Sequence, residues 1–207
     1  MALSIRIHPQ DPQPRLVNQA AAALRAGALI VYPTDSCYAF GCTIGDKAAQ
    51  ERIRRIRHLG GAHELTMMCA SLSDLAQNGR VDDAVYRLLR RLTPGPYTFI
   101  LRATREVPRR LQDERRKTIG LRVPDHPIAA ALLSALGEPF LSSTLQLPED
   151  EFPLTDPDDI RERLDRLVDV IVDGGNCGLE PTTVVDLTGE APVVVRRGRG
   201  STALFEA

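Results

Sequence analysis

Tryptophan is absent from this sequence and other aromatic residues are rare, so rings cannot form most of its core. Aromatic residues make up 4% of the 207 residues, whereas 43% are hydrophobic and 26% are charged. These proportions are typical of a globular protein whose core is built from Leu, Val, Ile and Ala. The length fits one large domain.

Long apolar runs are also missing. No segment approaches the roughly 20 apolar residues that a membrane-spanning helix requires. The first ten residues, MALSIRIHPQ, lack the apolar segment of a signal peptide. We therefore expect no membrane attachment and a cytoplasmic location. The four cysteines, none of them in a CxxC pair, are expected to be free thiols.

Several nucleotide-binding and metal-binding motifs do not occur. The lack of GxxxxGK(S/T), and of GxGxxG after a strand, excludes a P-loop and a dinucleotide fingerprint. There is no HExxH, and the four histidines do not pair at metal-ligand spacing. We expect no metal site and no tightly bound cofactor. No GxSxG marks a nucleophile elbow, although a Ser-His-Asp triad without that motif stays open.

Lysine is scarce among the basic residues. Of 26 basic residues only Lys47 and Lys117 are lysines, which leaves 24 arginines, and the net charge is −1. A genomic preference for arginine codons is one explanation. The other is a need for planar two-pronged contacts with phosphate or carboxylate, which lysine cannot make.

The arginines are grouped along the chain. Residues 102 to 122 contain eight basic side chains and three acidic ones, whereas residues 149 to 159 contain six acids and no base. A solvated charged face is the usual meaning of such a run. An arginine-lined concave surface would instead suit phosphates. The candidates for RNA binding are Arg52, Arg54, Arg55, Arg109, Arg110, Arg115 and Arg116.

Helical and extended patterns alternate along the whole chain, which predicts one α/β domain with a mixed sheet. Asp46 and Asp156 are placed to cap helices, and Gly27 and Gly137 to end them. The expected helices cover 15–26, 46–57, 82–92, 126–137 and 156–167, with a short helix capped by Ser71 or Ser73. The expected strands lie within 27–34, 65–70, 97–103, 118–124, 140–147, 168–175, 182–187 and 192–198.

The segment VYPTDSCYAFGC, residues 31 to 42, is unusual because a buried strand pattern ends in a run of polar residues. In α/β folds the ends of strands carry ligand-binding groups. Thr34, Ser36 and Tyr38 would then project hydroxyls into a crevice, and Gly41 would let the backbone turn tightly. An ordinary polar turn is the alternative.

This segment resembles the signature of the YrdC/YciO family, in which a strand precedes Pro-Thr-acid and a short aromatic-Gly segment. Four further pieces match that family in order and extend the resemblance over nearly the whole chain. They are TPGPYTFIL (93–101), TIGLRVPDHP (118–127), PFLSSTL (139–145), and PTTVVDL (181–187) with VVRRG (194–198). The family is that of the threonylcarbamoyl-AMP synthases, and the chain most resembles its YciO branch.

The resemblance implies a single domain with a twisted, open, mixed α/β sheet and a basic concave cavity. Synthase members condense L-threonine, bicarbonate and ATP, with Mg²⁺, to threonylcarbamoyl-AMP and pyrophosphate, and the product serves tRNA modification. Family members are also associated with double-stranded RNA. Nucleotide, L-threonine, and double-stranded or transfer RNA are therefore the expected ligands.

Site residues carry over by position within the matching motifs. The resemblance places L-threonine against Thr34, Arg122, Ser142 and Thr182, with the Arg122 guanidinium holding the carboxylate. It places the nucleotide against Arg57, Thr118, Thr144, Gln146 and Arg196. From the residues alone, Arg122 could instead form an internal ion pair with Asp35 or Asp186, and Thr34 could only cap a turn.

Two departures from the synthase pattern leave the chemistry open. Synthases carry Lys-x-Arg where this chain has Arg57-His58-Leu59, and Ser-x-Asn where it has Thr144-Leu145-Gln146. Adenylyl transfer relies on positioning and charge neutralisation, so the loss of a cation weakens it. Two hypotheses follow: an enzyme with weak or altered synthase activity, or a non-catalytic protein that binds RNA or nucleotide.

Overall fold

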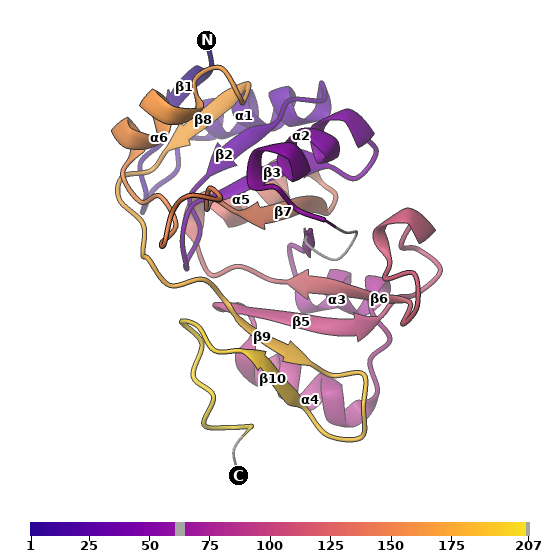
Figure 1. The fold of residues 1–207 in the computed structure, drawn as a ribbon. Coiled ribbons are helices and arrows are strands. Elements are labelled where there is room, and N and C mark those ends of the chain that lie inside the picture. Colours follow the sequence, from indigo (N-terminus) through magenta and orange to yellow (C-terminus); the bar gives the residue numbers. More distant parts are fainter. Residues whose placement is uncertain (61–64, 206–207) are drawn as a thin grey trace.

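Ten strands form one continuous mixed sheet, which twists along its length (Figure 1). In the computed structural model residues 1–60 and 65–205 are described, and His63 lies outside this part. The strand order is β1-β8-β2-β3-β7-β4-β6-β5-β9-β10. The strands are β1 Leu3–Arg6, β2 Ile30–Tyr32, β3 Ala39–Thr43, β4 Thr66–Met68, β5 Tyr97–Arg102, β6 Thr118–Arg122, β7 Phe140–Thr144, β8 Val170–Asp173, β9 Thr183–Asp186 and β10 Val193–Arg196.

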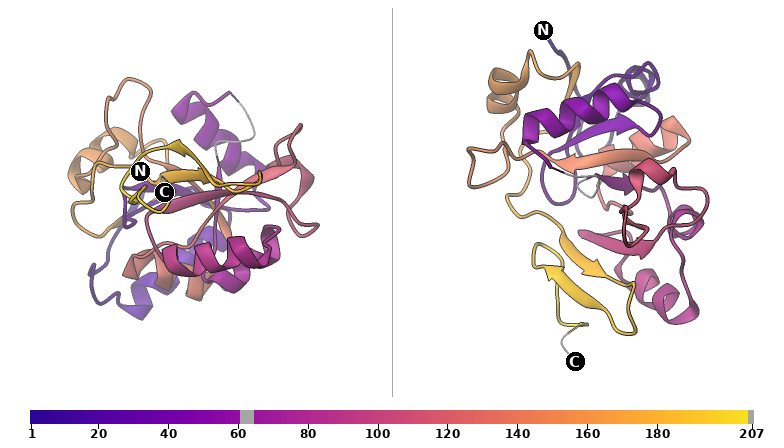
Figure 2. Two further views of the ribbon diagram at one scale, coloured as in Figure 1. Left: turned by 90° about the horizontal axis from the view of Figure 1, so that it is seen from below. Right: turned by 45° about the vertical axis from the view of Figure 1, so that its right-hand side comes forward.

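Helices lie on both sides of this sheet, as the two views in Figure 2 show. They are α1 Pro14–Arg25, α2 Lys47–Arg57, α3 Leu72–Asn78, α4 Asp83–Leu92, α5 Pro127–Leu136 and α6 Pro157–Leu164, with a 3-10 helix at Arg109–Leu111. The predicted caps are confirmed at Asp46 and Asp156, whose carboxylates accept backbone N–H groups of the first turn. Of the two serines, Ser71 caps α3.

The core consists of two apolar clusters. The smaller one contains residues of α1 and α5 with residues of β1, β2, β3, β4, β7 and β8. The larger one contains residues of α2, α3, α4 and α6 with residues of β2 to β9, including Val31 of β2 and Ile171 of β8. Leu, Val, Ile and Ala supply most of both, as the composition predicts. Tyr32 and Phe140 add an edge-to-face pair with ring centroids 5.3 Å apart.

Two strands were not predicted from the sequence, and one glycine was misinterpreted. β1 pairs with β8 at the sheet edge, and β3 follows β2 directly as its antiparallel partner. Gly41, predicted to allow a tight turn, lies within β3, paired with Ile30 and Ser142. A Cβ there would come within 3.1 Å of Ile30, Tyr32 and Phe140, so close packing is what requires a glycine.

Within the described residues, no helix is long and apolar enough to cross a membrane. No group of three or more His, Cys, Asp or Glu side chains in the same ranges is placed to hold a metal ion. The four cysteines are free thiols, and Cys37, Cys42 and Cys69 are buried.

Candidate functional site

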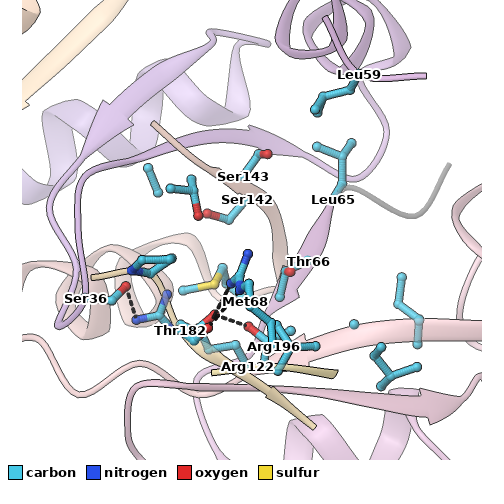
Figure 3. A pocket seen from close by; sticks show the side chains of 18 of the residues that line it. Ser36, Leu59, Leu65, Thr66, Met68, Arg122, Ser142, Ser143, Thr182 and Arg196 are labelled. Carbon is cyan, nitrogen blue, oxygen red and sulfur yellow. Dashed lines mark hydrogen bonds between the residues drawn. The ribbon is translucent and has the colours of Figure 1, made fainter. Parts of the chain in front are cut away.

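A cavity of about 460 Å³ lies over the middle of the sheet (Figure 3). Alternate residues of the central strands form much of its lining, because successive side chains of a strand point to opposite faces. The loop between β2 and β3, the end of α2 and the segment before β6 complete the walls. The strand residues are Ala39, Thr66, Met68, Thr98, Ile100, Thr118, Ile119, Gly120, Arg122, Ser142, Ser143, Thr144, Val184 and Arg196.

All nine residues that the resemblance assigned to ligands line this one cavity. They come from positions spread over 163 residues of chain, and the sheet order brings them together. Four arginines and one aspartate are among the lining residues, which makes the cavity basic. The nine are Thr34, Arg57, Thr118, Arg122, Ser142, Thr144, Gln146, Thr182 and Arg196.

Arg122 and the loop between β2 and β3 form one end of the cavity. Arg122 is the last residue of β6 and is 7% exposed. Its Nη2 donates to Thr34 Oγ1 at 3.3 Å and to Ser36 Oγ at 3.2 Å, and Figure 3 shows Ser36 facing the guanidinium. A guanidinium flanked by two hydroxyls is a suitable receptor for a carboxylate.

Both alternatives left open by the sequence are present at this end. Arg122 Nη2 also donates to Asp35 Oδ1, and the two side chains are only 8% and 10% exposed. Thr34 closes its own turn, because its hydroxyl donates to Cys37 O at 2.7 Å and accepts from Ser36 N at 3.2 Å. Asp186 is not the partner of Arg122; it pairs with Arg116.

The Asp35–Arg122 pair is incompletely satisfied. Among residues 1–60 and 65–205, the buried side-chain nitrogen and oxygen atoms without a hydrogen-bond partner are Asp35 Oδ2 and Arg122 Nε. Such atoms are rare in folded proteins, because each costs the desolvation of a polar group. Arg122 lines the cavity, and Asp35 lies directly beside it.

A threonine and arginine cluster forms the wall near β9 and β10. Arg196 donates from Nε and Nη2 to Thr182 O at 3.2 and 2.9 Å, and from Nη2 to Thr182 Oγ1 at 3.1 Å. Thr182 Oγ1 also lies 2.9 Å from Thr98 Oγ1. Figure 3 shows Thr182 and Arg196 together on one side of the cavity.

Arg57 and Gln146, the positions of the departures, meet at the opposite wall. Arg57 donates from Nη1 to Ser143 Oγ at 2.5 Å and from Nε to Gln146 O at 3.2 Å. The Gln146 amide donates to Asp150 O and Glu151 O at 3.2 and 3.1 Å. Gln146 therefore anchors the loop after β7 with its NH₂ group, a contact that the sequence pattern did not indicate.

Burial keeps the nearby phenol and thiol neutral. Tyr32 is fully buried, which raises the pKa of its phenol, and its hydroxyl lies 2.7 Å from Ser142 Oγ. Burial likewise raises the pKa of the Cys37 thiol at the cavity wall. Neither group is an anion near neutral pH, so neither cancels the positive charge of a cavity arginine.

The arginines predicted for RNA lie outside the cavity except for Arg116, and many have internal partners. Arg52 pairs with Asp169, and Arg116 pairs with Asp186. Arg54 and Arg55 both lie near Glu51, and Arg110 donates to Ile44 O. Arg109 and Arg115 are exposed. The basic run is thus partly neutralised at the surface, which the sequence alone did not reveal.

Ser36 lines the cavity as predicted, whereas Tyr38 does not, because its hydroxyl donates to Gly175 O. Three cavity hydroxyls were missed by sequence reasoning: Thr66, Thr98 and Ser143. The two-residue period along strands is a signal for two of them, because Thr66 and Thr98 share a face with Met68 and Ile100. Gly120 lies between them on β6; its Cβ would contact Thr66 and Thr98 at 3.4 Å. A side chain at this position would occupy the cavity floor.

Gly178 supports the loop that carries Thr34 and Ser36. A Cβ at Gly178 would lie 2.6 Å from the backbone oxygen of Ser36. We expect Gly178→Ala to displace this loop and lower the free energy of unfolding by about 1–3 kcal/mol, the usual cost of overpacking. Denaturant unfolding measures this. Gly45→Ala is the control, since a Cβ there meets nothing within 4 Å; equal effects of both substitutions would contradict the prediction.

Comparison with known proteins agrees with this geometry. Residues 22–198 match the Sua5/YciO/YrdC family, whose description is "Telomere recombination". The chain is 57% identical over 199 residues to "Uncharacterized protein YciO" of Escherichia coli strain K12, covering 96% of this chain and 97% of that protein. It is 30% identical over 191 residues to the threonylcarbamoyl-AMP synthase of Halorhodospira halophila, covering 91% and 98%.

Solved structures show the same fold. The crystal structure of E. coli YciO superimposes with a TM-score of 0.95 at 56% identity and covers 99% of this chain and 100% of that one. The structure of P. abyssi Sua5 complexed with L-threonine superimposes with a TM-score of 0.83 at 26% identity, covering 96% and 57%. On the matched residues and the shared fold, the chain belongs to the Sua5/YciO/YrdC family.

Proposed function

We propose that the cavity binds L-threonine and ATP side by side and that the protein is a YciO-type member with weak or altered threonylcarbamoyl-AMP synthase activity. The observation that carries this proposal is the convergence of all nine assigned residues on one basic cavity. A structural relative of the same fold is described as complexed with L-threonine.

The reaction needs two condensations and no redox cofactor. The threonine nitrogen bonds to the carbon of bicarbonate, and one water leaves. An oxygen of the resulting carbamate then attacks the α-phosphorus of MgATP, and pyrophosphate leaves. Arg122 would orient the threonine carboxylate, and Arg57 and Arg196 would balance the phosphate charge, in keeping with the electrostatic character of such transfers.

Weak or altered activity is proposed because of the contacts around Arg57. In place of Lys-x-Arg this chain has one cation, and Arg57 is engaged with Ser143 and Gln146. The amide of Gln146 is turned to the Asp150–Glu151 backbone. Removing one donor from a transition-state site typically costs about 2.7–4 kcal/mol.

Pyrophosphate release tests this proposal. We expect release that requires L-threonine, bicarbonate and MgATP together, at a lower rate than that of the H. halophila relative under the same conditions. Binding of L-threonine and ATP without release would favour the alternative, a non-catalytic nucleotide- and RNA-binding protein. If calorimetry detects binding of neither L-threonine nor ATP, both the synthase hypothesis and the non-catalytic alternative are refuted.

We further propose electrostatic, sequence-independent RNA binding at the exposed face around Arg109 and Arg115. Affinity for double-stranded or transfer RNA should fall steeply with salt, because phosphate contacts release counterions. Charge reversal of both arginines should weaken binding and reduce the salt slope by about 1 per lost phosphate contact. The control reverses Arg87 and Arg91, two exposed arginines at α4. Equal loss in both double variants, or a flat salt response, would contradict this surface.

A further inference from the structure

The four cavity arginines differ in the charge of their partners. Arg122 is the most buried of them and bonds to the Asp35 carboxylate. Arg116 also bonds to a carboxylate, that of Asp186, but its side chain is 53% exposed at the cavity edge. Arg196 donates to the neutral carbonyl and hydroxyl of Thr182. When one ligand has a carboxylate and the other has several phosphates, each anionic group must bind the correct arginine.

Asp35 lies where it can affect which anionic group binds Arg122. Its Oδ1 accepts from Arg122 Nη2, while its Oδ2 is buried with no hydrogen-bond partner. The negative charge of this carboxylate is therefore quenched by the guanidinium alone, with no backbone N–H or hydroxyl on the second oxygen. Because Asp35 is buried beside Arg122, its charge acts strongly on any anion that approaches Arg122.

We propose that Asp35 is the specificity-determining residue at Arg122, admitting an α-amino acid and keeping phosphate groups away. The inference rests on the proposed function, because it concerns the same amino-acid site. An α-amino acid is a zwitterion: its carboxylate meets Arg122 while its ammonium is attracted by Asp35. Inorganic phosphate or a nucleotide phosphate carries no cationic group, so nothing in the ligand offsets its repulsion by Asp35.

As a consequence, different arginines of the cavity bind different ligands. Arg122 together with Asp35 carries no net charge, and this pair selects a net-neutral ligand. The Arg196 end, with neutral partners, takes the anionic phosphates. ATP is thus prevented from occupying the amino-acid site in the reverse orientation, in which its phosphates would take the arginine that the threonine carboxylate requires.

Competition calorimetry tests this directly. L-threonine binding is measured with and without millimolar orthophosphate for the wild type, Asp35→Asn and Asp113→Asn. Asparagine at 35 keeps an oxygen for Arg122 Nη2 and removes the charge. Asp113 lines the same cavity and accepts from the backbone of Arg115; its variant removes an equal charge away from Arg122.

We expect phosphate to leave L-threonine affinity unchanged in the wild type and in Asp35→Asn to weaken it by at least about tenfold, equivalent to about 1.4 kcal/mol. Asp113→Asn should behave as the wild type. Equal phosphate sensitivity of Asp35→Asn and the wild type would overturn the inference. Should Asp35→Asn fail to fold, tenfold competition by phosphate in the wild type would still overturn it. A wild type that binds no L-threonine would refute the proposed function itself.

Discussion

Replacing Arg122 with alanine should abolish L-threonine binding and also destabilise the protein. The substitution removes the guanidinium that donates to Thr34 and Ser36 and leaves Asp35 as an uncompensated buried charge. Breaking one partner of a buried ion pair costs about 3–5 kcal/mol. Denaturant unfolding and calorimetry with L-threonine measure the two effects separately.

A double variant separates binding from stability. Arg122→Ala combined with Asp35→Ala removes both charges, and much of the lost stability should return because no lone charge stays buried. L-threonine binding should remain absent in the double variant. Arg122→Lys keeps a cation and loses the planar fork, so it should bind weakly at best. Normal affinity in the folded fraction of Arg122→Ala would mean that Arg122 serves only the ion pair.

ATP binding should depend on Arg57 and Arg196 together. Each faces the cavity from a different wall, one at the end of α2 and one at the end of β10. A hydrogen bond to a charged group contributes about 1.5–3 kcal/mol, so we expect each alanine substitution to weaken ATP binding by about 10- to 100-fold. The double substitution should leave no measurable affinity by calorimetry.

Arg197 provides the matched control for this prediction. It follows Arg196 directly and donates to Thr202 Oγ1 outside the cavity. Arg197→Ala removes the same charge from the same strand end and should change ATP affinity by less than about threefold, as expected for a screened surface charge. A loss in Arg197→Ala as large as that in Arg196→Ala would point to a general charge effect and against a phosphate contact by Arg196.

The periodicity of apolar residues and the helix-capping residues predicted most helices and strands well, because these features depend on the local sequence. Asp46 and Asp156 cap helices through their own side chains, and Gly137 ends α5 in the left-handed conformation that glycine favours. β3 was missed because its sequence follows a polar loop, and its pairing with β2 and β7 is a long-range property. Gly41 was misread for the same reason.

The candidate site was predictable in part. Motif positions alone were enough to identify Thr34, Arg122 and Thr182 as cavity residues. The ion pairs were harder to predict from the sequence, because several carboxylates could pair with each arginine and only the fold determines which one does. The sequence offered both Asp35 and Asp186 to Arg122, and the sheet order gives Asp35 to Arg122 and Asp186 to Arg116. The turn of Gln146 toward the loop after β7 likewise depends on tertiary structure.

A crystal structure with L-threonine and a non-hydrolysable ATP analogue tests the central claim most directly. We predict both ligands in the one cavity, with the threonine carboxylate within hydrogen-bond distance of Arg122 and the phosphates against Arg57 and Arg196. Phosphates on Arg122, or ligands bound only outside the cavity, would contradict it.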